Sequence, residues 1–405
     1  MTTPAPDLKP QSALRHKPFR IYFAAGLVSY LGMWFEKVAL GWFAWELTHS
    51  SFWTGFVAVA VTAPTGLFGP LIGVLAERWD HRRASIILNI MLGCASVGLF
   101  ILASLDGVSI LPVAALSLVI GVLSALYHPV RLVLVSQVVP RQFLVSAVSL
   151  TAMAYNASRV VGPALAGIVI AAAGTQTAFL VNASTYLPIA IVLPFLPLLV
   201  RARPTGDMGG LAAQLMAGLR YARGQRLIWW AIGIAVISSL VGRGAVEIMP
   251  AIVGKLLGGT AGDLAFFTSL AGGGAVAASL FYSFLSPAPT RIGLWLALSL
   301  PLNTLSIMAL GLAQSNWVMA ILFVASGFFT TIIGIGSQTI VQVSVDDAYR
   351  ARVLTWWSSA NFGGATLGAM SMGIGGDIFP LSAVLLTFGL VGTAVGIWSA
   401  LRPRV

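Results

Sequence analysis

Residues 84–105 read ASIILNIMLGCASVGLFILASL and contain no charged side chain. An α-helix needs about 20 apolar residues to cross the hydrocarbon core of a bilayer, and this run is long enough. Similar runs follow one another along the 405 residues, of which 58% are hydrophobic and 9% are charged. Soluble domains carry about 25% charged residues. The composition therefore excludes a soluble or disordered chain and predicts a multi-pass membrane protein.

The apolar runs predict an all-α integral membrane protein with twelve transmembrane helices. Helices are expected because backbone polar groups in lipid must be satisfied within their own segment, and the runs are too long for barrel strands. The predicted spans lie near residues 20–46, 52–76, 84–105, 108–138, 143–173, 177–200, 227–254, 261–286, 292–313, 317–345, 351–378 and 381–401. The single cysteine, Cys94, lies in an apolar run, and we expect a buried, unreactive thiol.

The basic residues predict the orientation of these helices. Cytoplasmic loops are enriched in Lys and Arg. With the N-terminus in the cytoplasm, most of the 23 Lys and Arg residues fall in cytoplasmic segments. The exceptions are Lys255 on the opposite side and, inside spans, Lys37, Arg131, Arg159 and Arg243. We therefore expect both termini in the cytoplasm. The positive charge then reports topology, and no nucleic-acid partner is expected because no soluble basic face exists.

The chain divides into two halves of similar size. Residues 1–200 are expected to form a six-helix bundle with a cytoplasmic tail, and residues 227–405 a second six-helix bundle. The halves echo each other, with NASRVVGPALAG at 156–167 and NFGGATLGAMSMG at 361–373. Between them, 201–226 is a polar linker whose apolar residues predict an amphipathic helix on the inner leaflet. A duplicated bundle places a central site between its halves.

Two motifs resemble those of the major facilitator superfamily. Residues 73–83, GVLAERWDHRR, are similar to the G-x-L-A-D-R-x-G/D-R-R/K signature after the second helix. Residues 162–167, GPALAG, resemble the GPxxGG signature of drug exporters, and WFEKVALGWFAWELTHSSFWTG at 34–55 resembles the subfamily of enterobactin exporters and macrolide efflux proteins (drug:proton antiporters). The resemblance covers essentially the whole chain and implies a 6+6 pseudo-symmetric fold. Glu77 stands where Asp is commoner, and His81 where Arg is usual.

The resemblance also implies roles for these motif residues. The loop would act as a conformational latch on the ends of neighbouring helices, and its alternative is a basic turn that serves only topology. Its residues are Gly73, Glu77, Arg78, Asp80, Arg82 and Arg83, with Arg131 on the fourth span. In the other motif, Gly162 and Gly167 would let neighbouring helices approach closely, and Pro163 would bend its helix.

Charged residues inside the spans are the best indication of a site, because each is costly in lipid unless paired or hydrated. Glu36 and Glu247 are the candidates for proton coupling, since partial desolvation lets a carboxylate bind and release a proton near neutral pH. Alternatives remain open, among them that Glu36 is merely exposed at the membrane interface. Glu36 could pair with Lys37 or another base, and Glu247 could form a salt bridge with Arg243 four residues earlier.

Polar and aromatic residues of the spans are the candidates for a substrate cavity. The bases within the spans outnumber the acids, which favours an anionic or zwitterionic small-molecule substrate. The candidates are Trp34, Lys37, His128, Asn156, Arg159, Arg243, Gln338, Gln342, Trp356 and Asn361.

The preferred function is a proton-coupled exporter of an amphipathic small molecule, such as a siderophore, macrolide or other drug, that works by alternating access. The alternatives are an uptake or lysolipid-type transporter and, less favoured, a non-transporting membrane sensor. No cofactor is expected, because no nucleotide-binding motif occurs and the proton gradient supplies the energy. No metal site and no enzyme activity are expected either. We expect a monomer in contact with membrane lipids, in the bacterial cytoplasmic (inner) membrane.

Overall fold

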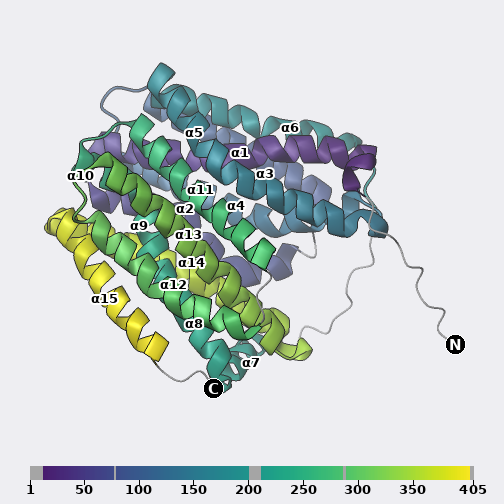
Figure 1. Cartoon of the computed structure of the whole chain (residues 1–405). Helices are drawn as coiled ribbons and strands as arrows, with labels where there is room; N and C mark the ends of the chain where they lie inside the picture. Colours follow the sequence, from purple (N-terminus) through teal and green to yellow (C-terminus); the bar gives the residue numbers. More distant parts are fainter. Residues whose placement is uncertain (1–11, 77–78, 200–210, 286–288, 402–405) are drawn as a thin grey trace.

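The computed structural model describes residues 12–76, 79–199, 211–285 and 289–401, and throughout these ranges the regular elements are helices. Figure 1 shows them as a bundle of long, mostly antiparallel helices. The first half contains η1 (Ala13–Arg15), α1 (Lys17–Thr48), α2 (Ser51–Ala76), α3 (His81–Ala103), α4 (Ile110–Val138), η2 (Arg141–Phe143), α5 (Leu144–Thr185), α6 (Leu187–Val192) and η3 (Leu193–Phe195).

The second half begins after residue 210. It contains α7 (Leu211–Gly224), α8 (Arg226–Ser238), the π-helix η4 (Ser239–Arg243), α9 (Gly244–Glu247), α10 (Met249–Leu257), α11 (Ala261–Leu285), α12 (Pro289–Leu310), α13 (Asn316–Ser344), α14 (Asp347–Ile378) and α15 (Leu381–Leu401). Nine stretches of the described residues are long and apolar enough to cross a membrane. One of them, Ser146–Phe195, is 50 residues long.

That long stretch is bent at Gly174, inside α5. Gly174 has φ 81° and ψ 166°, which is a backbone conformation that interrupts the helix and that glycine adopts at little cost. α5 therefore consists of two legs, and the second continues into α6 and η3. The bend coincides with the boundary that the sequence predicts between the spans 143–173 and 177–200.

The two halves meet along α2 with α14 and along α5 with α11. Small residues permit this contact. A Cβ added at Gly167 would overlap the Cβ of Ala265, and one added at Gly55 would lie 2.7 Å from the carbonyl oxygen of Ala369. Neither position can take a larger side chain without moving a helix. Membrane helices commonly associate through such small-residue surfaces.

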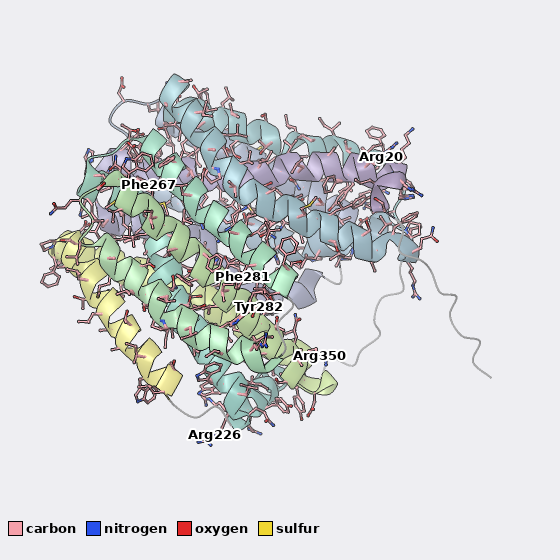
Figure 2. The ribbon with its side chains drawn as sticks, in the orientation of Figure 1. Arg20, Arg226, Phe267, Phe281, Tyr282 and Arg350 are labelled. Carbon is pink, nitrogen blue, oxygen red and sulfur yellow. The ribbon has the colours of Figure 1, made fainter. Side chains whose placement is uncertain are left out.

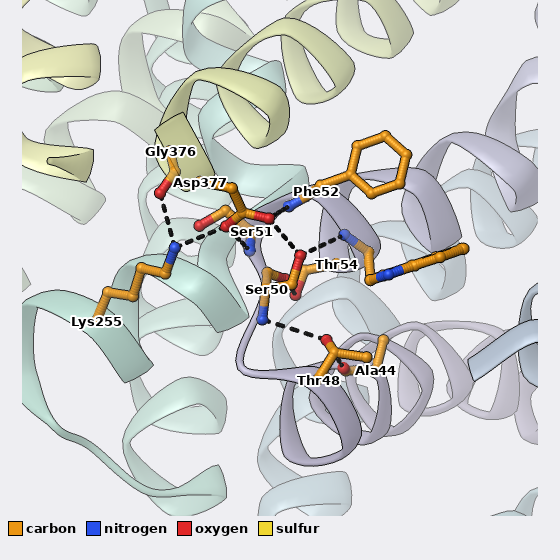
Figure 3. Close-up of polar contacts among 10 residues, drawn as sticks. Ala44, Thr48, Ser50, Ser51, Phe52, Thr54, Lys255, Gly376 and Asp377 are labelled. Atoms are coloured by element: carbon orange, nitrogen blue, oxygen red, sulfur yellow. Dashed lines mark hydrogen bonds and ion pairs between the residues drawn. The ribbon is translucent and has the colours of Figure 1, made fainter. Parts of the chain in front are cut away.

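A polar cluster ties the halves together at the end of the bundle where α1 turns into α2 (Figure 3). The Asp377 carboxylate accepts hydrogen bonds from the Ser50 hydroxyl and from the backbone N–H groups of Ser51 (2.7 Å) and Phe52 (3.1 Å). It also forms an ion pair with Lys255 at 2.7 Å. Lys255, the one base that the sequence places opposite the others, is thus held by a carboxylate of its own half.

Other basic residues lie elsewhere on the bundle. Figure 2 shows Arg20, Arg226 and Arg350 along the right and lower edge of the view, away from Phe267. These arginines lie at or near the starts of α1, α8 and α14.

Cys94 and the linker are two places where the structure can be compared with the sequence. The prediction that Cys94 is buried is wrong, because its side chain is exposed on α3; an apolar run does not reveal which face of a helix packs against protein. The linker helix exists as α7, and its end packs on α14, where the rings of Tyr221 and Tyr349 stack at 4.5 Å. Residues 201–210 of the predicted linker lie outside the described residues.

Candidate substrate and proton site

An ion pair joins the two halves in the interior of the bundle. Lys37 Nζ on α1 donates to Glu247 Oε1 on α9 at 2.6 Å. The Glu247 side chain is 4% exposed and that of Lys37 is 31% exposed, so the carboxylate is the more deeply buried partner. Glu247 therefore pairs across the interface with Lys37 instead of with Arg243 on its own helical segment.

A cavity of about 60 Å³ adjoins this pair. Both halves line it, with Trp34, Lys37, Val57 and Val61 from α1 and α2, and Glu247, Met249, Pro250, Leu264 and Thr268 from α9, α10 and α11. A space of this size admits a few water molecules. It is far smaller than the roughly 300–1,000 Å³ of pockets that hold drug-sized ligands. A large substrate would require the halves to separate here.

Irregular helix geometry sets the position of Glu247. The π-helix over Ser239–Arg243 adds a residue to its turn, and Pro250 near the start of α10 lacks the N–H that would continue the ladder. A Cβ at Gly244 would lie 2.8 Å from the backbone of Gly368 on α14. The chain from η4 to α10 is thus a broken helix pressed against α14, and such breaks commonly line transporter sites.

Two further cations lie at this interface. The guanidinium of Arg159 on α5 is 5.6 Å from the ring centroid of Trp34, and that of Arg243 on η4 is 5.4 Å from the ring of Phe362 on α14. Lys37 Nζ also lies over Trp34, at 5.5 Å. Arg159 is repelled by Arg243 and attracted by Glu247, so these charges act on one another.

Glu36 occupies a different place from its neighbour Lys37. It is 5% exposed and packs inside the first half, against the second leg of α5. Tyr186 Oη donates to Glu36 Oε2 at 2.7 Å, and the amide of Asn182 donates to the same oxygen. Asn182 also donates to Ser96 Oγ at 3.1 Å. Within the described part of the chain, no base forms an ion pair with Glu36.

The remaining cavity candidates are dispersed. Asn361 is buried and accepts from Ser239 Oγ at 2.7 Å, while the Asn156 amide is exposed and bonds the carbonyl of Ala152 on its own helix. None of the others lines the cavity beside Lys37 and Glu247: His128 and Gln342 are exposed, and Gln338 and Trp356 are half-buried.

The latch candidates divide into separate groups. Glu77 and Arg78 lie outside the described residues, and Gly73 lies in the last turns of α2. Asp80 caps α3 by accepting from the N–H of Arg83 at 3.2 Å. Arg82 donates to the carbonyls of Pro194 (3.1 Å) and Leu196 (2.5 Å), within its own half.

Arg131 lies apart from the loop. Its guanidinium is held among the rings of Tyr30, Tyr127 and Tyr155, with its centre 4.6–5.9 Å from their centroids. In the second motif, a Cβ at Gly162 would lie 2.7 Å from the Cβ of Trp34, so this glycine lets α5 pack on α1, and Pro163 lies inside α5.

Sequence reasoning missed the partners of Glu36. Asn182 and Tyr186 are four residues apart in the predicted span 177–200, a spacing that places both on one face of a helix. An amide and a phenol on one face of an otherwise apolar run could have indicated a polar partner inside the first half.

A helical bundle with an ion pair between two halves and a broken helix beside a cavity has the architecture of a multi-pass membrane transporter. The model of the transmembrane secretion effector family matches residues 8–403. The chain belongs to this family of major facilitator transporters and is not an enzyme.

Known proteins agree with this assignment. The chain is 25% identical over 382 residues to the enterobactin exporter EntS of Shigella boydii serotype 18, with 93% of this chain and 90% of that protein covered. The identity is the same to the enterobactin exporter EntS of Escherichia coli O81.

Among solved structures, the nucleoside transporter NupG has a TM-score of 0.73 at 12% identity, covering 95% of this chain and 100% of that one. A bacterial homologue of the lysosomal transporter Spinster, in an inward-facing and unoccupied conformation, has a TM-score of 0.69 at 12% identity, with 96% and 95% covered. These structural likenesses concern the fold alone.

Proposed function

We propose that the chain exports an amphipathic small molecule from bacterial cells, driven by protons that move inward across the cytoplasmic membrane. Glu36 carries this proposal. Its buried carboxylate has neutral hydrogen-bond partners and no ion-pair partner among the described residues, so a proton bound there would neutralise it without displacing a cation. A carboxylate in such a place can bind a proton in one conformation and release it in another.

The interface pair would couple this proton to movement of the halves. Glu247 Oε1 is held by Lys37, whereas Glu247 Oε2 is buried and finds no hydrogen-bond partner among the described residues. Protonation of Glu247, or entry of a substrate beside it, would weaken the link between α1 and α9. The halves could then separate around the cavity, as alternating access requires.

The proposed topology has twelve crossings and both termini in the cytoplasm. The two legs of α5 supply one crossing each, and α1 and α14 join the other apolar stretches. The basic residues at the starts of α1, α8 and α14 then face the cytoplasm, as the positive-inside rule expects. In this topology the cluster around Asp377 lies on the opposite side, where it holds the two halves together. No cofactor takes part, and the working unit is a monomer.

The test is transport by the purified protein in liposomes. Antiport predicts that enterobactin accumulates in liposomes with an acidic interior, that a protonophore abolishes the accumulation, and that protein-free liposomes show none. Accumulation only in liposomes with an alkaline interior would indicate proton-driven uptake instead. A macrolide and a lysophospholipid, tested in the same way, examine the other substrate classes. Failure of a proton gradient to move any of the three would contradict the proposal.

A further inference from the structure

We propose that Arg159 and Arg243 form a subsite that binds the anionic group of an aromatic substrate at the interface of the two halves. The inference rests on the proposed transport function and specifies the substrate class. It comes from the balance of charges at the interface and from the aromatic side chains beside the two arginines.

The charges at the interface do not balance. Glu247 neutralises Lys37 through their ion pair. Arg159 and Arg243 have no carboxylate within ion-pair distance in the described ranges, although they come from different halves and interact electrostatically with each other. Uncompensated charges inside a membrane protein are costly, and they commonly mark substrate pathways. An anion between the two guanidinium groups would remove the imbalance.

The arginines have aromatic neighbours on both sides of the interface. Trp34 contacts the Arg159 guanidinium, and Phe362 contacts that of Arg243. Trp34 also lines the cavity, and its indole N–H is buried without an acceptor among the described residues. Guanidinium groups bind planar oxyanions through paired N–H donors. The guanidinium groups of Arg159 and Arg243 would bind an oxyanion, and the rings of Trp34 and Phe362 would pack against an aromatic ring. The subsite therefore fits a ligand that carries an oxyanion on an aromatic ring.

Two probes of the same shape and opposite charge test the subsite. Naphthalenesulfonate carries an oxyanion on an aromatic ring, and naphthyltrimethylammonium carries a cation on the same ring. Calorimetry on the purified protein should show that the sulfonate binds about tenfold or more tightly than the ammonium, because only the sulfonate can accept charge-assisted hydrogen bonds from the two guanidinium groups.

Arginine variants locate the effect. Arg159→Gln and Arg243→Gln should each weaken sulfonate binding about tenfold or more, whereas Arg159→Lys and Arg243→Lys should recover part of it. Arg131→Gln is the matched control, because the Arg131 guanidinium also lies among aromatic rings, but these are Tyr30, Tyr127 and Tyr155 of the first half instead of Trp34 and Phe362. It should leave sulfonate binding unchanged. The thermal unfolding temperature of each variant, measured without probe, separates lost binding from lost folding.

The results distinguish the subsite from the transport proposal. Equal binding of the two probes, or unchanged sulfonate binding in a folded Arg159→Gln and Arg243→Gln double variant, would overturn the subsite, even if proton-driven transport is observed. Arginine-dependent sulfonate binding in a protein that fails every liposome transport assay would support the subsite and count against the transport function.

Discussion

Each half of the molecule has a buried polar cluster, and the two clusters differ in one chemical respect. In the first half, Glu36 is surrounded by Asn182, Tyr186 and Ser96. In the second half, the amide of Asn303 donates to Ser238 Oγ at 3.0 Å and accepts from Thr330 Oγ1 at 3.1 Å. Both clusters join helices through hydrogen bonds, but only the first contains a carboxylate.

The difference shows that helix packing and the presence of a carboxylate are separate matters in this fold. The Asn303 cluster holds α8, α12 and α13 together with neutral groups alone. Packing of helices around a polar centre therefore does not require a carboxylate in this fold. A buried carboxylate is more costly than an amide, and the proposed proton binding gives the Glu36 carboxylate a role that packing does not require.

Glu36→Gln should have the largest effect. Glutamine keeps an oxygen that can accept from Tyr186 and Asn182, so the unfolding temperature should change little, but it cannot exchange a proton. Enterobactin accumulation driven by a pH gradient should fall to the level of protein-free liposomes. Continued gradient-driven accumulation by the variant would rule out Glu36 as the proton carrier.

Glu247→Gln should have the next largest effect, because it leaves Lys37 without its partner at the interface. We expect a loss of about 1–3 kcal/mol in unfolding free energy. The double variant Lys37→Met/Glu247→Gln should recover much of that loss, since no unpaired charge remains. Thermal unfolding of the two single variants and the double variant measures the coupling. Additive losses would show that the pair does not stabilise the interface.

Asn303→Ala should have a smaller effect of a different kind. It removes hydrogen bonds from the cluster that lacks a carboxylate, and we expect a loss of about 1–2 kcal/mol in stability. Proton coupling should persist, which makes the variant the matched control for Glu36→Gln. Loss of gradient-driven transport in a folded Asn303→Ala protein would show that the Asn303 cluster is needed for transport as well as for packing, and would contradict the contrast between the two clusters.

Asp377→Asn should have the smallest effect on stability, about 1 kcal/mol or less, because the Lys255 pair is partly exposed. The asparagine oxygen can still accept from the N–H groups at the start of α2. The destabilisation should shrink as salt screens the ion pair. Unfolding temperatures at low and high ionic strength measure this, and a loss that is independent of salt would contradict the assignment.

Much of the fold can be predicted from the sequence, because each membrane-spanning helix needs an apolar run of about 20 residues. The run 84–105 corresponds to α3 (His81–Ala103), and the predicted boundary after residue 173 corresponds to the bend at Gly174. The sequence does not reveal which way a side chain points between packed helices. Adjacent residues on a helix differ by about 100° in direction.

That geometry explains why the partners of the α1 charges cannot be chosen from the sequence. Glu36 points into the first half toward Asn182, and Lys37 points across the interface toward Glu247. From the sequence, Glu36 could pair with Lys37, and Glu247 could pair with Arg243. The actual partners lie far away in the chain, so their proximity depends on tertiary packing that spacing within one helix does not encode.

In the proposed mechanism, substrate moves outward in exchange for a proton bound at Glu36. The most direct measurement uses liposomes that contain the purified protein and a pH-sensitive dye, with no imposed pH gradient. When enterobactin is added outside, antiport predicts that the interior becomes more alkaline in step with substrate entry, because protons leave as substrate enters. Glu36→Gln should abolish the signal. Substrate entry with no change of internal pH would rule out proton antiport, and an equal signal from Glu36→Gln would rule out Glu36 as the proton carrier.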